Sequence, residues 1–558
     1  MAAKLYGADN APLKIQFITD PHYYSRKGGT EGKAYEKAEA KSQKVIKDSD
    51  LVIQAGFDLL CTDTSTDIVV LAGDTTRDGE LASHGEFIEM LRDLKKRGKR
   101  VYVITATHDY RDGGVADGYD GDKKIQVPAV EERHDLWQMY YEFGPNEAIA
   151  THPDSMSYVV QLAPGYRLFA LNDDTNYKPE GERGSGYSDD CMAWILDQLE
   201  DARKNNQFVI AMTHHPMIAP SPFYAIIGKG DMQRNHETTR EIFADNGLQC
   251  MLTGHTHIHD ISVVETKKGN TFYDIACGAM VGCPPTMRNI TLDPAHAKVD
   301  VETVTITNVP GLDTGGKPFD QYMRTFFFGM ISELLDAAAT DIDHLAEMTD
   351  AFSVPGEKVK KLGWLIKPIA KWLNKLTFKK AWRLCKKESG LSKKDIADIA
   401  DRVVDFILEL MQNLYCGDSP YGPDTREYKI CCGLLNVIDA FLNTIHFSIG
   451  KVLKGATSVR GLVEPLLWNP GPCDANATLP LYPLYDDENP APKKAEKPAF
   501  DDPVRPSKKG PLVLAILVLL VILVLAILVG LIALVVWAVV AIVHAATTGC
   551  IGALPFVF

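Results

Sequence analysis

The sequence lacks a patterned set of cysteines. Its 11 cysteines are an odd number, and apart from the adjacent pair Cys431 and Cys432 they are scattered. A disulfide framework or a zinc module would show an even set or a repeated spacing. The cysteines therefore favour a reducing compartment.

The sequence also lacks an excess of positive charge. Its 59 lysines and arginines are outnumbered by 73 acidic residues, which gives a formal net charge of −14. Proteins that bind nucleic acid neutralise phosphates with Lys and Arg. The charge balance therefore argues against a stable nucleic-acid partner.

The first residues lack a long apolar run. The segment MAAKLYGADNAPLKIQ has no stretch of signal-peptide length, so we expect no export signal for the globular part. We also find no internal repeat. At roughly 100–200 residues per domain, a chain of 558 residues is long enough for several units.

Residues 1–310 show the pattern of a layered α/β domain. Early β-rich runs are separated by helical stretches, which predicts a largely parallel sheet, and later runs follow one another closely, which predicts antiparallel hairpins. The predicted strands are 13–19, 68–72, 101–105, 157–162, 167–171, 208–213, 250–253, 261–265, 271–275 and 299–306. The predicted helices are 33–55, 81–97, 189–205 and 237–246.

Residues 315–467 have a helical pattern instead. Stretches such as 330–346 and 394–414 place apolar residues at three- and four-residue spacing. Residues 468–510 are rich in Pro and Asp, a composition that resists compact packing and predicts a linker.

Within the helical region, residues 358–394 form a basic amphipathic segment. Lys367, Lys371, Lys375 and Lys379 recur every fourth residue along one helical face. The apolar residues Leu362, Leu365, Ile366, Ile369, Trp372, Leu373 and Leu376 lie largely on the other face, and the tryptophans Trp364, Trp372 and Trp382 are interleaved. Two interpretations stay open: a helix lying on an anionic membrane surface, or an ordinary helix that packs on its neighbours and keeps its lysines in water.

Residues 511–543 contain no charged residue and consist mostly of Leu, Val, Ile and Ala. A transmembrane helix needs about 20 such residues, so we predict a transmembrane segment here, followed by an apolar tail over 544–558. An unbroken helix would reach roughly 50 Å against a hydrocarbon core of about 30 Å. It would therefore tilt strongly, project beyond the bilayer, break near Gly530 into a hairpin, or pack with copies of itself in a homo-oligomer.

The charges that flank this segment predict its orientation. Lys508 and Lys509 precede it, and no Lys or Arg follows it. The positive-inside rule then places the large N-terminal domain in the cytoplasm. We expect a protein of the cell membrane whose main domain faces the cytoplasm.

Five predicted strands each run into a short segment that contains Asp or His. The segments that follow them are DPH at 20–22, GD at 73–74, ATHD at 106–109, HH at 214–215 and GHTH at 254–257. In open α/β sheets, ligands bind at the edge where the strands end. Asp and neutral His are ligands for divalent ions such as Mn, Fe and Zn, and two such ions can support an in-line phosphoryl displacement. Each segment alone is common by chance, so the prediction depends on the ordered set.

This ordered set resembles the calcineurin-like metallophosphoesterases over roughly residues 12–305. The stretch LAGDTTRDGELASH is also similar to the Gly-Asp segment of bacterial members. The resemblance implies a four-layer αββα sandwich, in which two sheets pack together and helices cover both outer faces. It also implies a dinuclear metal centre whose metal-bound hydroxide attacks a phosphate ester, without a covalent protein intermediate.

The resemblance implies a role for each residue of the set. Asp20, His22 and His257 would hold the first metal, Asp74 would bridge the two metals, and His214 and His255 would hold the second. His108 would act as general acid or transition-state donor, and Asp109 would orient its ring. His215 is the less suitable ligand of the His-His pair.

One position departs from the family pattern. The family has Gly-Asn before the catalytic His, with the Asn amide oxygen on the second metal, and this sequence has Ala106 and Thr107. Thr107 could ligate directly or through water, the second metal could bind weakly, or the enzyme could be impaired.

Together these features predict a membrane-anchored, metal-dependent phosphoesterase that acts on a phosphomonoester or phosphodiester. The membrane setting makes a lipid-linked phosphate an attractive substrate. The alternative is a catalytically impaired module that uses the same fold as a scaffold or regulator at the membrane.

Overall fold

The structure is a computed structural model that describes residues 4–39, 42–174, 185–221, 224, 231–351, 356–399, 402–444, 448 and 457–492. Within these ranges, no helix is both long and apolar enough to cross a membrane. The predicted transmembrane segment 511–543 and the apolar tail 544–558 lie outside the described residues.

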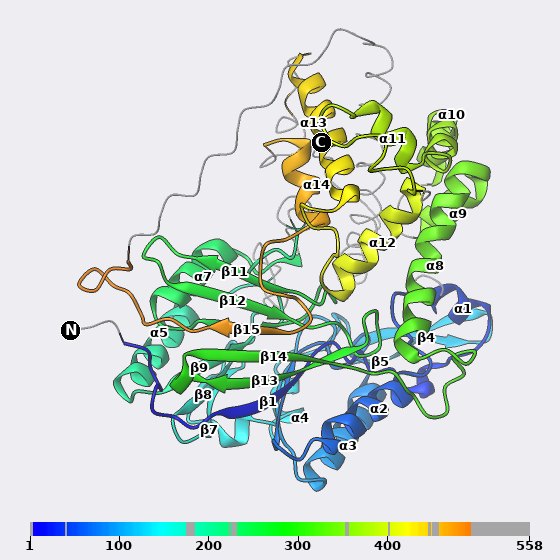
Figure 1. Cartoon of the computed structure of the whole chain (residues 1–558). Helices are drawn as coiled ribbons and strands as arrows, with labels where there is room; N and C mark the ends of the chain where they lie inside the picture. Colours follow the sequence, from blue (N-terminus) through cyan, green and yellow to red (C-terminus); the bar gives the residue numbers. More distant parts are fainter. Residues whose placement is uncertain are drawn as a thin grey trace.

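Two mixed sheets form the centre of the N-terminal domain (Figure 1). The first has the order β15-β14-β13-β1-β2-β3, and its strands β1, β2 and β3 are parallel. The second has the order β11-β12-β10-β9-β8-β7-β6, and its strands β8, β9, β10 and β12 are parallel.

The strands of the first sheet are β1 (Leu13–Ile18), β2 (Ile68–Ala72), β3 (Arg100–Ile104), β13 (Thr286–Asp293), β14 (Lys298–Thr305) and β15 (Ala477–Pro480). Those of the second are β6 (Ala150–His152), β7 (Ser157–Ala163), β8 (Tyr166–Ala170), β9 (Phe208–Met212), β10 (Cys250–Thr253), β11 (Ile261–Glu265) and β12 (Thr271–Ala276).

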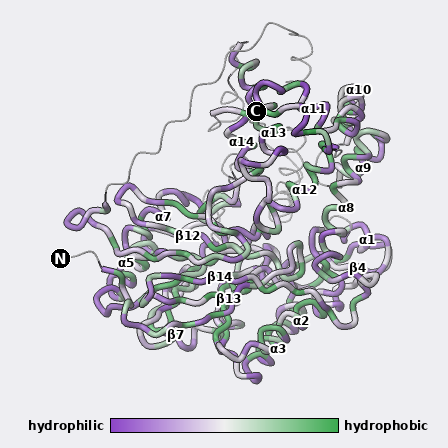
Figure 2. Tube along the Cα trace, viewed as in Figure 1, coloured by the Kyte–Doolittle hydropathy of each residue, from purple (hydrophilic) through white to green (hydrophobic). Residues whose placement is uncertain are grey.

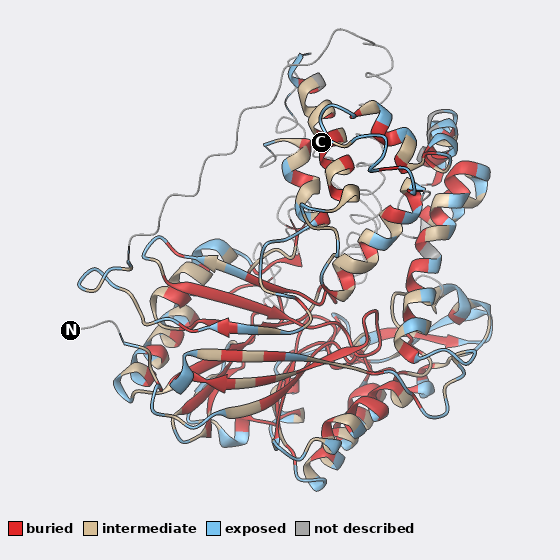
Figure 3. Cartoon of the chain, viewed as in Figure 1, coloured by how far each residue is buried: buried red, intermediate tan, exposed pale blue. Residues whose placement is uncertain are grey.

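Side chains that alternate along each strand build two different cores. Phe17 of β1 and Ile210 of β9 belong to the core between the sheets, whereas Ile18 packs toward the helices outside the first sheet. Both faces of the central strands are covered, and these strands are buried along almost their whole length (Figure 3). This explains why their sequences read as nearly continuous apolar runs.

Helices cover both outer faces. The first sheet is covered by α2 (Ser49–Thr62) and α3 (Leu81–Lys96), which alternate apolar and polar residues (Figure 2). The second sheet is covered by α5 (Asp189–Lys204) and α7 (His236–Asp245). The chain therefore has the expected order of helix, sheet, sheet and helix.

Several elements differ from the predicted ones. The predicted helix 33–55 is two helices, α1 (Lys33–Glu39) and α2, and the short helix α4 (Asp135–Met139) was not expected. The hairpin of β4 (Val115–Asp120) and β5 (Lys123–Pro128) was also missed. Its strands, VADGYD and KKIQVP, carry charged residues, and β5 is almost wholly exposed, so they lack the apolar pattern from which the other strands were predicted.

The helical region packs on the N-terminal domain through two of its helices. Its helices are α8 (Phe319–Thr340), α9 (Ile342–Ala351), α10 (Gly356–Leu373), α11 (Phe378–Leu384), α12 (Val403–Cys416), α13 (Arg426–Thr444) and α14 (Val459–Leu467). Phe327 of α8 and Tyr415 of α12 join the core beside the first sheet, and their ring centroids are 5.2 Å apart. The helical region is therefore anchored to the domain by a shared apolar core.

Part of the predicted linker 468–510 is folded. Residues 477–480 form β15, which pairs antiparallel with β14, and Leu479 and Leu481 are buried between the sheets. The linker prediction is wrong for this part, because two leucines at alternate positions supply apolar burial that the average composition conceals.

Candidate metal centre

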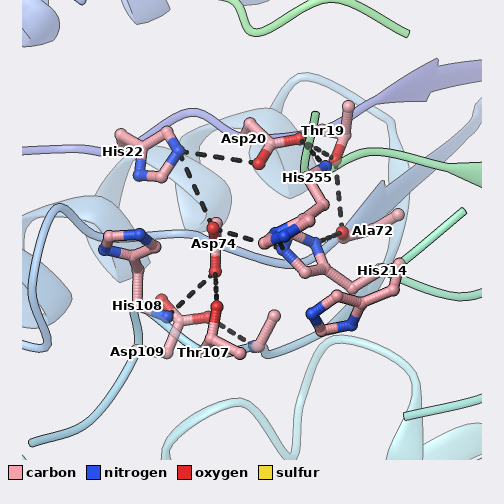
Figure 4. A network of polar contacts seen from close by, with 12 residues as sticks. Thr19, Asp20, His22, Ala72, Asp74, Thr107, His108, Asp109, His214 and His255 are labelled. Atoms are coloured by element: carbon pink, nitrogen blue, oxygen red, sulfur yellow. Dashed lines mark hydrogen bonds and ion pairs between the residues drawn. The ribbon is translucent and has the colours of Figure 1, made fainter. Parts of the chain in front are cut away.

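The loops after β1, β2, β9 and β10 bring six of the predicted ligands together in two groups. The first group is Asp20, His22 and His257, and the second is Asp74, His214 and His255. In each group one ligand atom per residue lies within 4.8 Å of the others. Figure 4 shows Asp74 between His22 on one side and His214 on the other.

The first group converges on one point. The Nε2 atoms of His22 and His257 are 3.1 Å apart. The Oδ1 atom of Asp20 lies 3.3 Å from Nε2 of His257 and 3.5 Å from Nε2 of His22. All three side chains are buried, so their electron pairs share a space from which water is largely excluded.

One oxygen of the Asp20 carboxylate is buried without a hydrogen bond. Its Oδ2 accepts hydrogen bonds from Thr19 Oγ1 at 2.7 Å and from the His255 backbone N–H at 3.0 Å. Its Oδ1 is buried and has no hydrogen-bond partner. A buried carboxylate oxygen is costly when it is unpaired, and a divalent cation would complete its coordination.

The second group is oriented by a backbone carbonyl. His214 Nε2 lies 3.2 Å from Asp74 Oδ2 and 3.2 Å from His255 Nδ1. The other ring nitrogen, Nδ1, is 2.8 Å from the Ala72 carbonyl oxygen. Because a carbonyl only accepts, Nδ1 carries the proton in the neutral ring, and the Nε2 electron pair points into the site.

Asp74 joins the two groups. Its Oδ2 faces His214 Nε2 at 3.2 Å and His22 Nε2 at 3.8 Å. Its Oδ1 accepts from the His108 backbone N–H at 3.0 Å and from Thr107 Oγ1 at 3.5 Å. This carboxylate therefore has the position that a bridging ligand needs, and Thr107 lies against it.

The electrostatics of the site favour a positive charge. Burial alone would raise the pKa of Asp20, but the rings of His257 and His22 hold it well below its usual range. Burial alone would lower the pKa of His214, but the carboxylates of Asp74 and Asp20 raise it to about 10. The carboxylates thus favour a proton on His214, and they would favour a divalent cation in the same place through the same attraction. The residues of the two groups fit two metal ions.

The backbone of the ligands is unusual. Asp20, His22, Asp74, His255 and His257 have positive φ angles of 51°, 43°, 51°, 65° and 56°. Residues other than glycine rarely adopt this left-handed region, and each such residue costs roughly 1–3 kcal/mol. Five of the nine such residues in the described part of the chain are in this site, so the strained conformations cluster where side chains must turn inward after a strand.

Gly73 gives a direct test of this crowding. Its φ is +88°, and a Cβ atom would lie 2.8 Å from His214 Nδ1 and 2.6 Å from Ala106 Cβ. We expect Gly73→Ala to lower the free energy of unfolding by about 1–3 kcal/mol and to weaken metal binding, because His214 must move. Urea denaturation and metal content would measure both effects.

Gly98 is the matched control. Its φ is +94°, but no atom lies within 4 Å of the position of its Cβ. Gly98→Ala should therefore show only the backbone cost and no change in metal content. Equal metal loss in the two variants would contradict the crowding argument.

His108 lies beside the metal ligands, but its partner is not the predicted one. Its ring centroid is 5.0 Å from that of His22. Its Nδ1 is 2.7 Å from the Arg77 carbonyl oxygen and 3.1 Å from Asp78 Oδ1. The ring is therefore oriented by the segment that follows Asp74.

The prediction that Asp109 orients the His108 ring is wrong. The Asp109 carboxylate accepts hydrogen bonds from the backbone N–H groups of Ala106 and Thr76, at 2.8 and 2.9 Å, and from Thr75 Oγ1 at 2.6 Å. These bonds tie the loops after β2 and β3 together. Asp109 thus stabilises the backbone that carries His108.

His215 belongs to neither of the two groups of ligands. Its Nδ1 lies 3.2 Å from Asp173 Oδ2, and its ring is tilted against that of His255 with centroids 4.3 Å apart. This contact agrees with the choice of His214 as the ligand of the pair, and it gives His215 a supporting position beside His255.

Three neighbours of the site were missed. Asp78 stands in the GDTTRDG segment, four residues after Asp74, and this spacing was a usable signal. Asp231 Oδ1 lies 3.8 Å from His255 Nε2, in a segment without a motif. Lys44 precedes α2, and burial lowers the pKa of its ammonium group to about 8, although Asp74 and Asp20 act in the opposite direction.

Comparison with solved structures gives distant likenesses. A dimetal phosphatase from Danio rerio is 14% identical, with a TM-score of 0.38, and the match covers 52% of this chain and 96% of that one. A protein of Thermus thermophilus is 10% identical, with a TM-score of 0.27 and coverage of 53% and 99%. A predicted phosphoesterase from Streptococcus pneumoniae is 12% identical, with a TM-score of 0.17 and coverage of 54% and 95%.

No curated protein matches the sequence. Residues 13–259 match the model of the calcineurin-like phosphoesterase family, and this range contains all the predicted ligands and His108. Residues 13–259 of this chain are therefore a calcineurin-like phosphoesterase domain.

Proposed function

We propose that the chain is a metal-dependent phosphoesterase that hydrolyses a phosphomonoester or a phosphodiester at a dinuclear centre. The observation that carries the proposal is the position of Asp74, whose Oδ2 faces both His22 and His214. A carboxylate between two groups of His and Asp ligands is suited to a pair of ions such as Mn, Fe or Zn. When bound, two such ions would supply an activated water and positive charge for the phosphoryl oxygens.

The residues of the chain would supply positioning and a proton. Asp20, His22 and His257 would hold one ion, and His214 and His255 the other, with Asp74 shared. His108 would donate a proton or a hydrogen bond to the phosphate or its leaving group through Nε2, because its Nδ1 contacts Arg77 O and Asp78. Asp78 would stabilise the protonated ring.

The setting that we propose follows from the C-terminal sequence. Residues 511–543 would anchor the protein in the cell membrane as a single span or a hairpin, with the phosphoesterase domain facing the cytoplasm. This location favours a lipid-linked phosphate among the substrates. Packing of this segment with its copies would give a homo-oligomer.

Hydrolysis by the full-length chain tests the function. Protein that has been stripped of metal with a chelator would be assayed with a phosphomonoester reporter and a phosphodiester reporter, each with and without added Mn²⁺. We expect turnover of at least one reporter only when the metal is present. If neither reporter is turned over in a metal-dependent way, the proposal is contradicted and the alternative of a non-catalytic scaffold is favoured. The main support for that alternative is Thr107, which stands in place of an Asn ligand.

Thr107 leads to a second prediction. Its hydroxyl reaches Asp74 Oδ1 at 3.5 Å, whereas a longer Asn side chain would present an amide oxygen to the second ion. We expect Thr107→Asn to tighten binding of the second Mn²⁺ and to keep turnover, because an added oxygen ligand raises affinity for such ions. Calorimetric titration with Mn²⁺ would measure this.

The control is Thr151→Asn, at an exposed position of β6. It should bind Mn²⁺ as the parent does. If Thr107→Asn binds the second ion no more tightly than this control, position 107 does not reach the metal site.

A further inference from the structure

Helix α10 already has an apolar side that is packed within the protein. Val359 and Ala370 join a cluster with Leu334 of α8 and Leu345 of α9. Gly363 lies close to α9, because a Cβ atom there would be 2.8 Å from Ile342 Cγ2. An ordinary amphipathic helix would leave only polar residues on the opposite side.

The opposite side of α10 is not only polar. Trp364 is 76% exposed and Trp372 is 36% exposed. Leu362 is 50% exposed, but it lies about 160° from Trp364 around the helix, nearer to the packed side. At 3.6 residues per turn, residues eight apart lie about 80° apart around a helix, so the two tryptophans share the outer side. Packing on α8 and α9 therefore explains the burial of Val359 and Ala370 but does not explain the exposed Trp364 and Trp372.

Lysines surround the exposed tryptophans. Lys361, Lys371 and Lys375 are exposed, and Lys360, also exposed, is 2.9 Å from Asp343. Residues 358–387 contain ten lysines, one arginine and no acidic residue, in a chain whose net charge is −14. Figure 1 shows α10 at the outer end of the helical region, beyond α8 and α9. The strongest positive charge of the chain thus lies on the same surface as Trp364, the most exposed tryptophan of the described residues.

We propose that the outer face of α10, formed by Lys361, Trp364, Lys371 and Trp372 together with Lys375 just after the helix ends, docks on the surface of an anionic phospholipid bilayer. Tryptophan side chains favour the membrane interface, where an apolar ring and a polar N–H are both satisfied. Lysines beside them are attracted to anionic headgroups. A nucleic acid would approach a larger area of the protein than α10 alone. The negative charge of the rest of the chain would then repel its phosphates, so a nucleic acid is disfavoured.

Docking of α10 on the bilayer is separate from insertion of the predicted membrane segment. Residues 511–543 would anchor the chain in any bilayer, whereas α10 would bind only where the lipid surface is negative. The proposal does not depend on the catalytic activity, because it rests on the exposed side chains and charges of α10.

Fluorescence quenching by lipids tests the proposal on the full-length chain. The protein would be reconstituted into phosphatidylcholine vesicles with or without phosphatidylglycerol, with bromine on the acyl chains to quench tryptophans that touch the bilayer. We expect stronger quenching in the anionic vesicles. The variant with Trp364→Phe and Trp372→Phe should lose this difference, and so should the variant with Lys361→Gln, Lys371→Gln and Lys375→Gln.

The control is Trp194→Phe, since Trp194 packs partly buried on α5, beside the second sheet. It should keep the lipid-dependent quenching of the parent. Trp537 lies within 511–543 and would be quenched in both kinds of vesicle, so the readout is the difference in quenching between anionic and neutral vesicles. Reporter hydrolysis in detergent should be the same for the parent and the α10 variants. Equal quenching in neutral and anionic vesicles, or in the parent and the α10 tryptophan variant, would overturn the proposal, as would binding of RNA or duplex DNA that displaces the vesicles.

Discussion

Asp74→Ala is expected to abolish metal-dependent hydrolysis, with a fall in kcat/KM of at least about 10³-fold, because it removes the ligand shared by both ions and with them the charge that stabilises the transition state. Asp74 Oδ2 is the atom that faces His22 and His214. Among the described residues, no other carboxylate pairs with histidine rings of both groups. Reporter hydrolysis at saturating Mn²⁺ would measure the loss.

The matched control for this variant is Asp300→Ala. Asp300 is a carboxylate of β14 that pairs with Lys298 at 2.7 Å, away from the site. The Asp300→Ala variant should hydrolyse the reporter as the parent does. Circular dichroism should show that both variants are folded. Turnover by Asp74→Ala near the level of the parent would rule out the two-metal mechanism.

His108→Gln should lower kcat by about 10²–10⁴-fold, the usual contribution of a positioned acid or base, while both ions stay bound. His108 lies outside both groups of ligands, so metal content and catalysis should separate in this variant. The control is His296→Gln, because His296 is at the surface and its ion pair is with Asp293, three residues before it. Metal content and kcat would be measured on the same preparations.

The orientation of His108 can be tested through Asp78. Asp78→Asn should lower kcat by roughly 10–100-fold, the range for partners that orient a functional histidine, with little change in KM and with an altered pH profile of kcat. Asp109→Asn should instead lower thermal stability, because its carboxylate ties the loops after β2 and β3. If Asp109→Asn shifts the pH profile and Asp78→Asn does not, the assignment of the partner is wrong.

Strands and ligands could be predicted because they follow strong local patterns. The central strands are buried on both faces, so nearly every residue of β2 and β9 is apolar. Asp74 follows two residues after β2 and His214 two residues after β9. Parallel strands bring their carboxyl ends to one edge of the sheet. The six ligands therefore meet although Asp20 and His257 are far apart in sequence.

The missed features depend on contacts between distant segments. β15 pairs with β14 across the whole helical region, and its composition resembles that of the linker around it. The orientation of His108 depends on how the loop after β2 approaches the loop after β3, which no periodicity encodes. For the same reason the sequence points to the adjacent Asp109 as the partner of His108, whereas the structure places Asp78 there.

The same limit applies to α10. A periodic pattern shows that a helix is amphipathic, but it does not show which apolar side chains its neighbours will cover. Val359 and Ala370 are covered, whereas Trp364 is not. Only the packing of α8 and α9 distinguishes the internal apolar side from the external one.

The central claim is that two ions share Asp74, and metal stoichiometry tests it most directly. The parent, the Asp20→Ala variant and the Asp74→Ala variant would be stripped with a chelator, reloaded with Mn²⁺ and analysed by mass spectrometry for metal. We predict two ions in the parent, one in Asp20→Ala, whose second group is intact, and fewer than one in Asp74→Ala. A single ion in the parent, or two ions retained in Asp74→Ala, would contradict the account.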